Sequence, residues 1–234
     1  HEPHIRKLIS LGNCVIKGQP TKGSIFIDNL GSSEFGFAMF RNIHTPFSND
    51  YKRSIGKPFS WVQCEILDQQ GKPAASNTVG YLGVKSESVT AGYWNNHLLT
   101  EKNRLGGYWL TGDLGYRDGN GQFFHVDRIS DKITTSEGPL YSCLVEELIL
   151  SNRDDIFECS IFGVVAESGL QTATIAIEMK ADYIADLDLL AQLNQLLSIN
   201  NHPQLTQLTF ESAHENVGAT GKKLKRKLRE EPTL

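Results

Sequence analysis

A carboxylate and a guanidinium stand at the ends of two strand-like segments, Asp113 and Arg128. The sequence DGNG at 118–121 lies between them, and because its residues tolerate positive φ it predicts a β-hairpin turn. The hairpin would bring both charges to one rim of a sheet. There they could bind the hydroxyls and phosphate of a nucleotide. An ordinary surface salt bridge would have the same pattern.

Two further segments combine glycine with groups that could contact a ligand. The loop Asn29 to Glu34 holds a glycine, two hydroxyls and a carboxylate after a predicted strand, which suits ligand contact or a simple turn. Lys222 follows Thr220–Gly221, and a glycine hinge would let its ammonium reach into a site. The basic segment 219–229 around it also fits a solvated helix face with Leu224 and Leu228 packed inward, or a tail for nucleic acid or acidic lipid.

Composition narrows the class of protein. The chain has 234 residues, 39% hydrophobic and 21% charged, which is ordinary for a globular protein with a real core. Its net charge of −4 argues against a general nucleic-acid binder. No apolar run approaches the ~20 residues of a membrane span and no export signal is present, so the expected location is the cytoplasm. The four cysteines form no metal-binding pattern and are expected to be buried thiols.

Hydrophobic periodicity predicts three regions of mixed α/β and α+β class. Residues 1–55 hold short strands at 8–11 and 24–27 with little helix, so they are expected to be the tail of a larger amino-terminal α/β domain. Residues 56–130 alternate in short hairpin strands and predict a distorted antiparallel β-barrel. Residues 131–234 predict a small, mobile α+β domain, with helices at 142–151 and 184–199 and strands at 158–165 and 172–179.

Five motifs, in order, cover nearly the whole chain: NLGSSE at 29–34, GYLGVKSESVTAGYWNN at 80–96, WLTGDL at 109–114, VDRISDKI at 126–133 and TGKKLKR at 220–226. They resemble YG(S/T)TE, GYLxVxGxxVxxGYxNN, (Y/W)xTGDL, (G/D)RxxDxI and TGKIxRR of the adenylate-forming superfamily. That superfamily comprises acyl- and aryl-CoA synthetases, luciferases and the adenylation domains of nonribosomal peptide synthetases. The chain is identified as resembling its carboxy-terminal half.

The resemblance implies a reaction and its nucleotide ligands. A carboxylic acid would attack the α-phosphate of ATP to give an acyl-adenylate and pyrophosphate, and a thiol of CoA or of carrier-protein phosphopantetheine would then take the acyl group. Glu34 would lie on the Mg²⁺–ATP side and serve the metal, with Ser33 as a hydroxyl contact beside it. Asp113 would accept hydrogen bonds from the ribose hydroxyls, and Arg128 would help to hold the same sugar.

Two residues of the last region receive roles in a domain movement. Asp131 would be the hinge about which the small domain turns between half-reactions. Lys222 would bridge the substrate carboxylate and the phosphate during adenylation, because a preplaced ammonium stabilises the charge that develops there. Closing of the small domain would bring that charge to the site, which couples chemistry to a conformational step.

The sequence departs from the family in three places. The phosphate-binding (S/T)GTTGxPKG loop is absent, so we expect the amino-terminal half of the enzyme to be a required partner and the chain alone to turn over poorly. Leu30 replaces an aromatic that stacks on adenine. Ser136–Glu137 replace two adjacent glycines, with Pro139 following, which favours a carrier-protein phosphopantetheine or adenylate formation alone over free CoA.

A non-catalytic relative that serves as an interaction or regulatory domain is the alternative. Retention of four dispersed charged residues (Glu34, Asp113, Arg128 and Lys222) favours the enzyme. A nucleic-acid-binding tail fits less well, because the net charge is negative and Lys222 has a better explanation.

Overall fold

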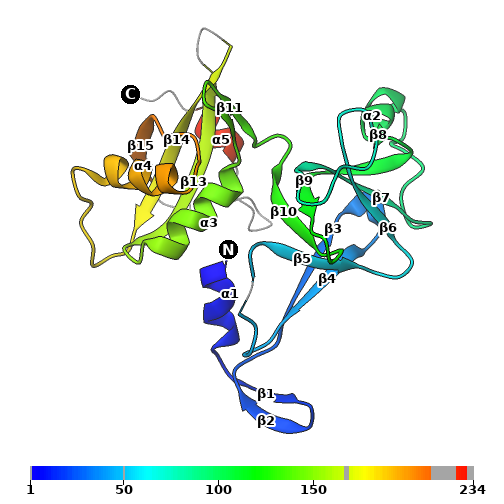
Figure 1. Ribbon diagram of the computed structural model, residues 1–234, viewed down its shortest axis with the longest axis horizontal. Helices are drawn as coiled ribbons and strands as arrows, with labels where there is room; N and C mark the ends of the chain where they lie inside the picture. Colours follow the sequence, from blue (N-terminus) through cyan, green and yellow to red (C-terminus); the bar gives the residue numbers. More distant parts are fainter. Residues whose placement is uncertain (1, 50, 166–168, 212–224, 231–234) are drawn as a thin grey trace. The chain divides into compact units, whose positions relative to one another are not determined.

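The computed structural model describes residues 2–49, 51–165, 169–211 and 225–230, and it divides into two compact units, His1–Ile129 and Ser130–Leu234. The class is mixed α/β with mostly antiparallel sheet, as predicted (Figure 1). The expectation that residues 1–55 end a larger domain stays a prediction.

The first unit is built on an eight-stranded antiparallel sheet in the order β3-β4-β5-β10-β9-β7-β6, with β8 beside β9. Its strands are β3 (Phe26–Gly31), β4 (Ala38–His44), β5 (Ser54–Pro58), β6 (Gln63–Leu67), β7 (Gly80–Lys85), β8 (Arg104–Leu105), β9 (Tyr108–Arg117) and β10 (Phe123–Arg128). The antiparallel hairpins predicted for 56–130 are confirmed. A closed barrel is not: among the described strands, β3 and β6 remain edges of an open sheet.

The core of the first unit lies against this sheet. Its buried residues are apolar and largely aromatic or branched: Phe35, Met39, Phe40, Val62, Ile66, Leu82, Val84, Trp109 and Phe123. Two short helices border it, the 3₁₀ helix η1 (Ser33–Phe35) and α2 (His97–Lys102). Asn96 caps α2 by accepting a hydrogen bond from the Leu99 N–H at 3.1 Å.

The amino-terminal segment differs from the prediction. A strand was expected at 8–11, whereas helix α1 (Glu2–Ile9) ends there and is followed by the hairpin of β1 (Asn13–Ile16) and β2 (Gln19–Lys22) (Figure 1). A short apolar run cannot be assigned from periodicity alone. Here the i,i+4 pair in which Arg6 Nε donates to Glu2 Oε1 at 2.7 Å supports the helix, and Ile9 is buried.

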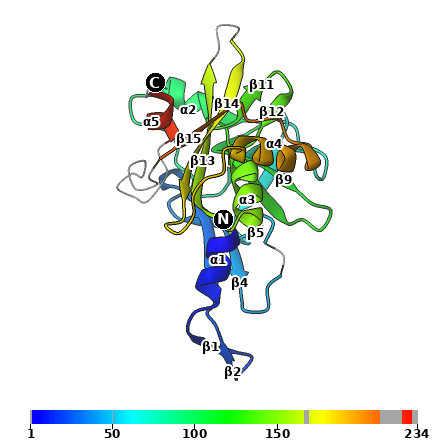
Figure 2. The ribbon, with the colours of Figure 1, turned by 90° about the vertical axis from the view of Figure 1, so that its left-hand side faces the viewer.

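The second unit is a three-stranded sheet with helices on both faces (Figure 2). β13 (Ile156–Val165) pairs antiparallel with β14 (Gln171–Met179), which pairs parallel with β15 (Gln207–Phe210). Helices α3 (Ser142–Asn152) and α4 (Leu189–Ile199) cover one face, α5 (Lys225–Glu230) covers the other, and β11 (Ile133–Thr135) and β12 (Gly138–Leu140) form a separate hairpin.

Alternation along the strands explains the two-sided packing of this unit. Ile161 and Ile175 belong to the core under α3 and α4, whereas Phe162 and Ala176 contact Leu228 of α5. The predicted helix at 142–151 and both predicted strands are confirmed. The helix predicted from 184 begins only at Leu189, because Ile184 and Leu187 are fully exposed and have no apolar surface to cover.

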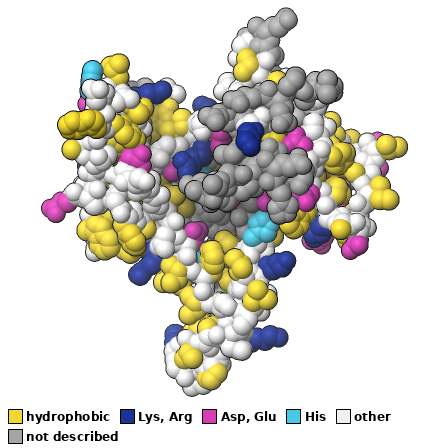
Figure 3. Space-filling model, turned by 180° about the vertical axis from the view of Figure 1, so that it is seen from behind, with side chains coloured by type: hydrophobic (Ala, Val, Ile, Leu, Met, Phe, Trp, Pro, Cys, Tyr) yellow, Lys and Arg dark blue, Asp and Glu magenta, His cyan; other side chains and the backbone are white. Residues whose placement is uncertain are grey.

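The described surface carries charges of both signs, with basic side chains interspersed among acidic and uncharged ones in the view of Figure 3. Within the part of the chain that the structure describes, no helix is both long and apolar enough to cross a bilayer.

Candidate functional site

The hairpin of β9 and β10 brings Asp113 and Arg128 together. The register pairs the two residues directly, and Arg128 Nε lies 3.0 Å from Asp113 Oδ1. Gly112 precedes the aspartate with φ +84°, a backbone conformation that glycine adopts without strain. The Asp113 side chain is 4% exposed and that of Arg128 is 48% exposed. The carboxylate is therefore fixed, while the guanidinium reaches into solvent.

A histidine lies behind this carboxylate, which the sequence did not indicate. His125 Nε2 is 3.4 Å from Asp113 Oδ1, and Arg53 Nη2 is 2.7 Å from His125 Nδ1. Arg53 and His125 lie 72 residues apart and meet because β5 pairs with β10. Only the pairing of these strands, and no local pattern, could have identified them.

The electrostatics of Asp113 favour the ionised form. Burial raises the pKa of its carboxyl, but the hydrogen bond from His125 and the positive charge of Arg128 outweigh burial. The net pKa of Asp113 lies below its ordinary value. An ionised carboxylate has only acceptors, so both of its oxygens can accept hydrogen bonds from hydroxyls.

Glu34 is held by hydroxyl donors from two loops. Ser32 Oγ donates to Oε2 at 2.7 Å, and the Tyr93 hydroxyl donates to Oε1 at 2.9 Å. The Ser32 bond is the main cause that lowers the pKa of Glu34, and the Tyr93 bond acts in the same direction. The predicted contact Ser33 is exposed beside it, so Ser32 is the serine that orients this carboxylate.

Tyr93 also links this carboxylate to the strand that carries Asp113. Its ring lies 5.6 Å from that of Trp109, centroid to centroid, and Trp109 is four residues before Asp113 on β9. A second hydrogen bond joins the two loops that carry Glu34 and Tyr93, because the Thr90 N–H donates to the Glu34 carbonyl at 2.7 Å. Leu30, at the position expected to contact adenine, packs against the same core as Phe35.

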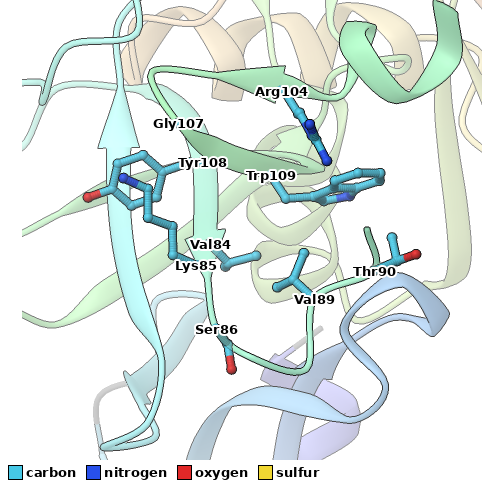
Figure 4. Close-up of a pocket in the computed structure, with 9 residues that line it drawn as sticks. All are labelled: Val84, Lys85, Ser86, Val89, Thr90, Arg104, Gly107, Tyr108 and Trp109. Carbon is cyan, nitrogen blue, oxygen red and sulfur yellow. The ribbon is translucent and has the colours of Figure 1, made fainter. Parts of the chain in front are cut away.

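A hollow of about 330 Å³ lies next to the Thr90 segment. Figure 4 shows Arg104 beside Trp109 on one side of it and Lys85 beside Tyr108 on the other. The Lys85 ammonium lies 3.8 Å from the Tyr108 ring centroid, and Val84 and Val89 also line the hollow. Arg104 Nη2 donates to the Ala91 carbonyl at 2.7 Å, so both cations of the hollow already have partners in the protein.

In the second unit, Asp131 and the helix α5 are joined. Arg229 Nη2 lies 2.8 Å from Asp131 Oδ1. Lys222 lies outside the described residues, but Lys225, three positions later, begins α5. Its ammonium is buried with Glu146 Oε1 at 2.7 Å and Ser142 Oγ at 2.6 Å.

The described residues contain no group of three or more histidine, cysteine or acidic side chains that could hold a metal ion. A single carboxylate such as Glu34 is nevertheless a suitable Mg²⁺ ligand, because Mg²⁺ is usually held by one or two carboxylates together with substrate phosphates and water.

No protein-family model matches the chain. A 3-aminoavenalumate diazotase from a Streptomyces species is 35% identical over 252 residues, covering 98% of this chain and 45% of the relative. A 2-succinylbenzoate–CoA ligase from Geobacillus kaustophilus is 36% identical over 127 residues, 54% of this chain and 26% of the relative. The chain thus spans less than half the length of these relatives.

Solved structures of similar fold cover most of the chain. An amide bond synthetase, McbA from Marinactinospora thermotolerans, matches with a TM-score of 0.76 at 25% identity, over 88% of this chain and 42% of that protein. The anthranilate CoA ligase AuaEII, solved with anthranoyl-AMP, matches with a TM-score of 0.74 at 23% identity, over 87% and 39%.

Proposed function

We propose that this chain, which belongs to the adenylate-forming enzymes, is the carboxy-terminal part of a ligase that activates a carboxylic acid with ATP. The observation that carries the proposal is the ionised, buried Asp113 on β9 beside the half-exposed Arg128 at the end of β10. This arrangement suits a nucleotide ribose better than a structural salt bridge, because one partner remains accessible.

The reaction proceeds in two steps. A carboxylate oxygen attacks the α-phosphorus of ATP, the bond to the β-phosphate oxygen breaks, and pyrophosphate leaves. A thiol of CoA or phosphopantetheine then attacks the acyl carbonyl, its proton is lost, and AMP leaves. Both steps move negative charge at fixed positions, which preplaced cations and hydrogen-bond donors stabilise.

The residues of the first unit bind and orient the nucleotide. Asp113 accepts hydrogen bonds from the ribose hydroxyls, and Arg128 donates to the same sugar. Glu34 offers an ionised carboxylate to Mg²⁺, with Ser33 at its side. When bound, Mg²⁺ neutralises phosphate charge during attack.

The residues of the second unit act when the small domain turns about its hinge. Asp131 is the hinge, and Lys222 supplies the ammonium that bridges the attacking carboxylate and the phosphate. The Arg229–Asp131 ion pair supports this division, because it ties the segment after Lys222 to the hinge residue itself. The complementary amino-terminal half supplies the phosphate-binding loop and the acyl pocket.

The acceptor thiol belongs to CoA or to a carrier protein. In the loop between β11 and β12 the Glu137 carboxylate accepts a hydrogen bond from the Gln204 N–H at 3.2 Å. An anionic group fixed there disfavours the phosphates of free CoA by charge repulsion. A phosphopantetheine arm on a carrier protein brings fewer phosphates past this position.

The test is ATP–pyrophosphate exchange by the full-length protein with a panel of carboxylic and amino acids, followed by loading of CoA and of a carrier protein. We expect exchange with one class of acid and thioester formation with one acceptor. A protein that binds AMP but exchanges with no acid is the non-catalytic alternative, an interaction or regulatory domain.

A second candidate is diazotisation of an amine, because the relative named as a diazotase matches 98% of this chain whereas the 2-succinylbenzoate–CoA ligase matches 54%. Nitrite is an oxyanion that could attack the α-phosphate as a carboxylate does, releasing pyrophosphate. An aryl amine would then attack the nitrite nitrogen and displace AMP, and loss of water would leave a diazonium group. Nitrite-dependent exchange, with a coloured product on coupling to a naphthol, distinguishes this candidate.

A further inference from the structure

Four side chains, from β9, from β10 and from the residue before β5, form a continuous polar series in the first unit. Arg53, directly before β5, contacts His125 on β10, and both His125 and Arg128 contact Asp113 on β9. The Arg53–His125 contact is made three times: besides the side-chain bond, Arg53 Nε donates to the His125 carbonyl at 3.3 Å and the His125 N–H donates to the Arg53 carbonyl at 3.0 Å. Arg53 therefore fixes the Nδ1 side of the His125 ring, while the Nε2 side contacts Asp113.

These contacts assign the tautomer of the imidazole. A guanidinium can only donate, so His125 Nδ1 must accept the hydrogen bond from Arg53 Nη2. The remaining proton then lies on Nε2, which faces Asp113 Oδ1. Arg128 Nε contacts the same oxygen, Oδ1. Both donors thus contact Oδ1, and the Thr111 side chain is a further hydrogen-bond partner of this carboxylate.

The backbone at Arg53 is held in an uncommon conformation for this contact. Its φ is +57°, in the left-handed region that favours glycine. An arginine there costs about 1 kcal/mol or more relative to an unstrained residue, and such strain persists only where surrounding contacts fix it. The strain is useful here because it places the Arg53 guanidinium on His125. His125 in turn contacts Asp113, the carboxylate proposed to bind the ribose.

We propose that His125, fixed by Arg53 in its Nε2–H form, is a positioning residue that orients the Asp113 carboxylate for recognition of the ribose hydroxyls. The inference rests on the proposed function, because it takes Asp113 as the ribose ligand. His125 does not touch the reacting atoms. It determines how strongly the site distinguishes a ribonucleotide from a nucleotide that lacks one ribose hydroxyl.

The test compares binding of AMP and 2′-deoxy-AMP to the full-length protein by calorimetry, which needs no acid substrate. We expect the preference for AMP to fall by about tenfold in His125→Leu, the scale of one hydrogen bond to a charged group. His125→Gln places an amide N–H near the position of Nε2 and should restore most of the preference. His125→Asn places it near Nδ1 and should not.

A second variant tests Arg53 without disturbing the backbone. Arg53→Gly removes the guanidinium and also relieves the left-handed strain, so the fold should be retained while the AMP preference falls. Asn77→Gly is the matched control, because Asn77 also has a left-handed φ of +61° and lies exposed in the same unit. Nitrogen NMR of the His125 ring should show the proton on Nε2 in the wild type and a mixture of tautomers in Arg53→Gly.

Each outcome bears on one claim. If the wild type prefers AMP and both His125→Leu and His125→Asn keep that preference, the positioning role is overturned and the proposed function stands. If the wild type binds the two nucleotides equally, Asp113 is not the ribose ligand, and the proposed function fails first. A ring proton found on Nδ1 in the wild type contradicts the assigned tautomer directly.

Discussion

Two ion pairs of the same chemical kind lie in opposite surroundings. Asp113 and Arg128 pair where β10 ends beside β9, and the arginine side chain is 48% exposed whereas the aspartate side chain is 4% exposed. Glu146 and Lys225 pair inside the second unit, where both side chains are 7% exposed or less. The Glu146 carboxylate also accepts the Ile161 N–H at 2.8 Å, and Lys225 reaches Ser142. The first pair leaves one partner available to a ligand, and the second uses both to attach α5.

The difference shows that a pair of charges is informative only with its burial. A buried pair whose partners are satisfied fixes one conformation, and removal of one partner leaves an uncompensated charge. A half-exposed pair contributes less to stability, and its exposed partner can contact a ligand at small cost. We therefore expect changes at the two pairs to separate stability from nucleotide binding.

The largest effect on stability is expected at the buried pair. Lys225→Met should lower the free energy of unfolding by about 3–5 kcal/mol, because the buried Glu146 carboxylate would lose the ammonium that lies 2.7 Å from it. Lys227→Met, on the exposed side of the same helix, should change it by no more than about 0.5 kcal/mol. Chemical denaturation followed by circular dichroism measures both. Equal stability of the two variants would contradict the anchoring role of Lys225.

Lys222 should show the opposite behaviour, although it is only three residues from the anchor. Lys222→Ala in the full-length protein should lower ATP–pyrophosphate exchange by about 10²–10³-fold, the loss typical of one preplaced donor at a developing charge. Its unfolding midpoint should not move. Lys223→Ala is the neighbouring control, and near-normal exchange in Lys222→Ala would sink the catalytic assignment.

At this half-exposed pair, binding should change more than stability. Arg128→Ala should lower the free energy of unfolding by less than Lys225→Met does, because Arg128 is half-exposed and His125 still contacts the buried Asp113 carboxylate. AMP should nevertheless bind more weakly, because the guanidinium is proposed to hold the ribose. Calorimetry with AMP and thermal unfolding of the same samples make the comparison. A loss of stability without a loss of binding would reduce this pair to a structural salt bridge.

A smaller effect is expected on the way the free energy of unfolding changes at acidic pH. The pKa of Asp113 is lowered below the ordinary value of 3.8, since the His125 bond and the Arg128 charge outweigh burial. A carboxyl with a lowered folded-state pKa contributes stability above its unfolded pKa, and this contribution is lost as pH falls through the folded value. Unfolding measured from pH 6 to pH 2 should therefore depend less on pH in Asp113→Asn.

Asp155 is the matched comparison in the second unit. Its hydrogen bond with Arg153 lowers the pKa of that carboxyl, so Asp155→Asn should weaken the acid dependence in the same direction. Only Asp113→Asn should also weaken AMP binding. If both variants bind AMP equally, the carboxylate of Asp113 is structural.

The sequence predicted those parts of the site that depend on local chemistry. The turn at 118–121 sets the register of β9 against β10, and that register makes Asp113 and Arg128 neighbours. The sequence does not indicate a role for His125, because its partner Arg53 precedes a distant strand and adopts a left-handed φ that no propensity favours for arginine. The helix at 2–9 was missed because four apolar or small residues do not distinguish a helix end from a strand.

The smallest expected effect uses one buried thiol, Cys159, and one partly buried thiol, Cys64, as reporters of the two units. Cys159 is 1% exposed, and its sulfur lies 4.0 Å from the Glu146 carbonyl, so it should be labelled by iodoacetamide only when the second unit opens. Burial, with a contribution from the Glu65 charge, raises the pKa of the Cys64 thiol to about 12, so at pH 8 Cys64 should react only when the first unit opens. Lys225→Met should then speed labelling of Cys159 and leave Cys64 unchanged, as mass spectrometry of the digested protein would show. Equal acceleration at both thiols would mean that the two units open together, and the buried pair would then stabilise the whole chain and not only the attachment of α5.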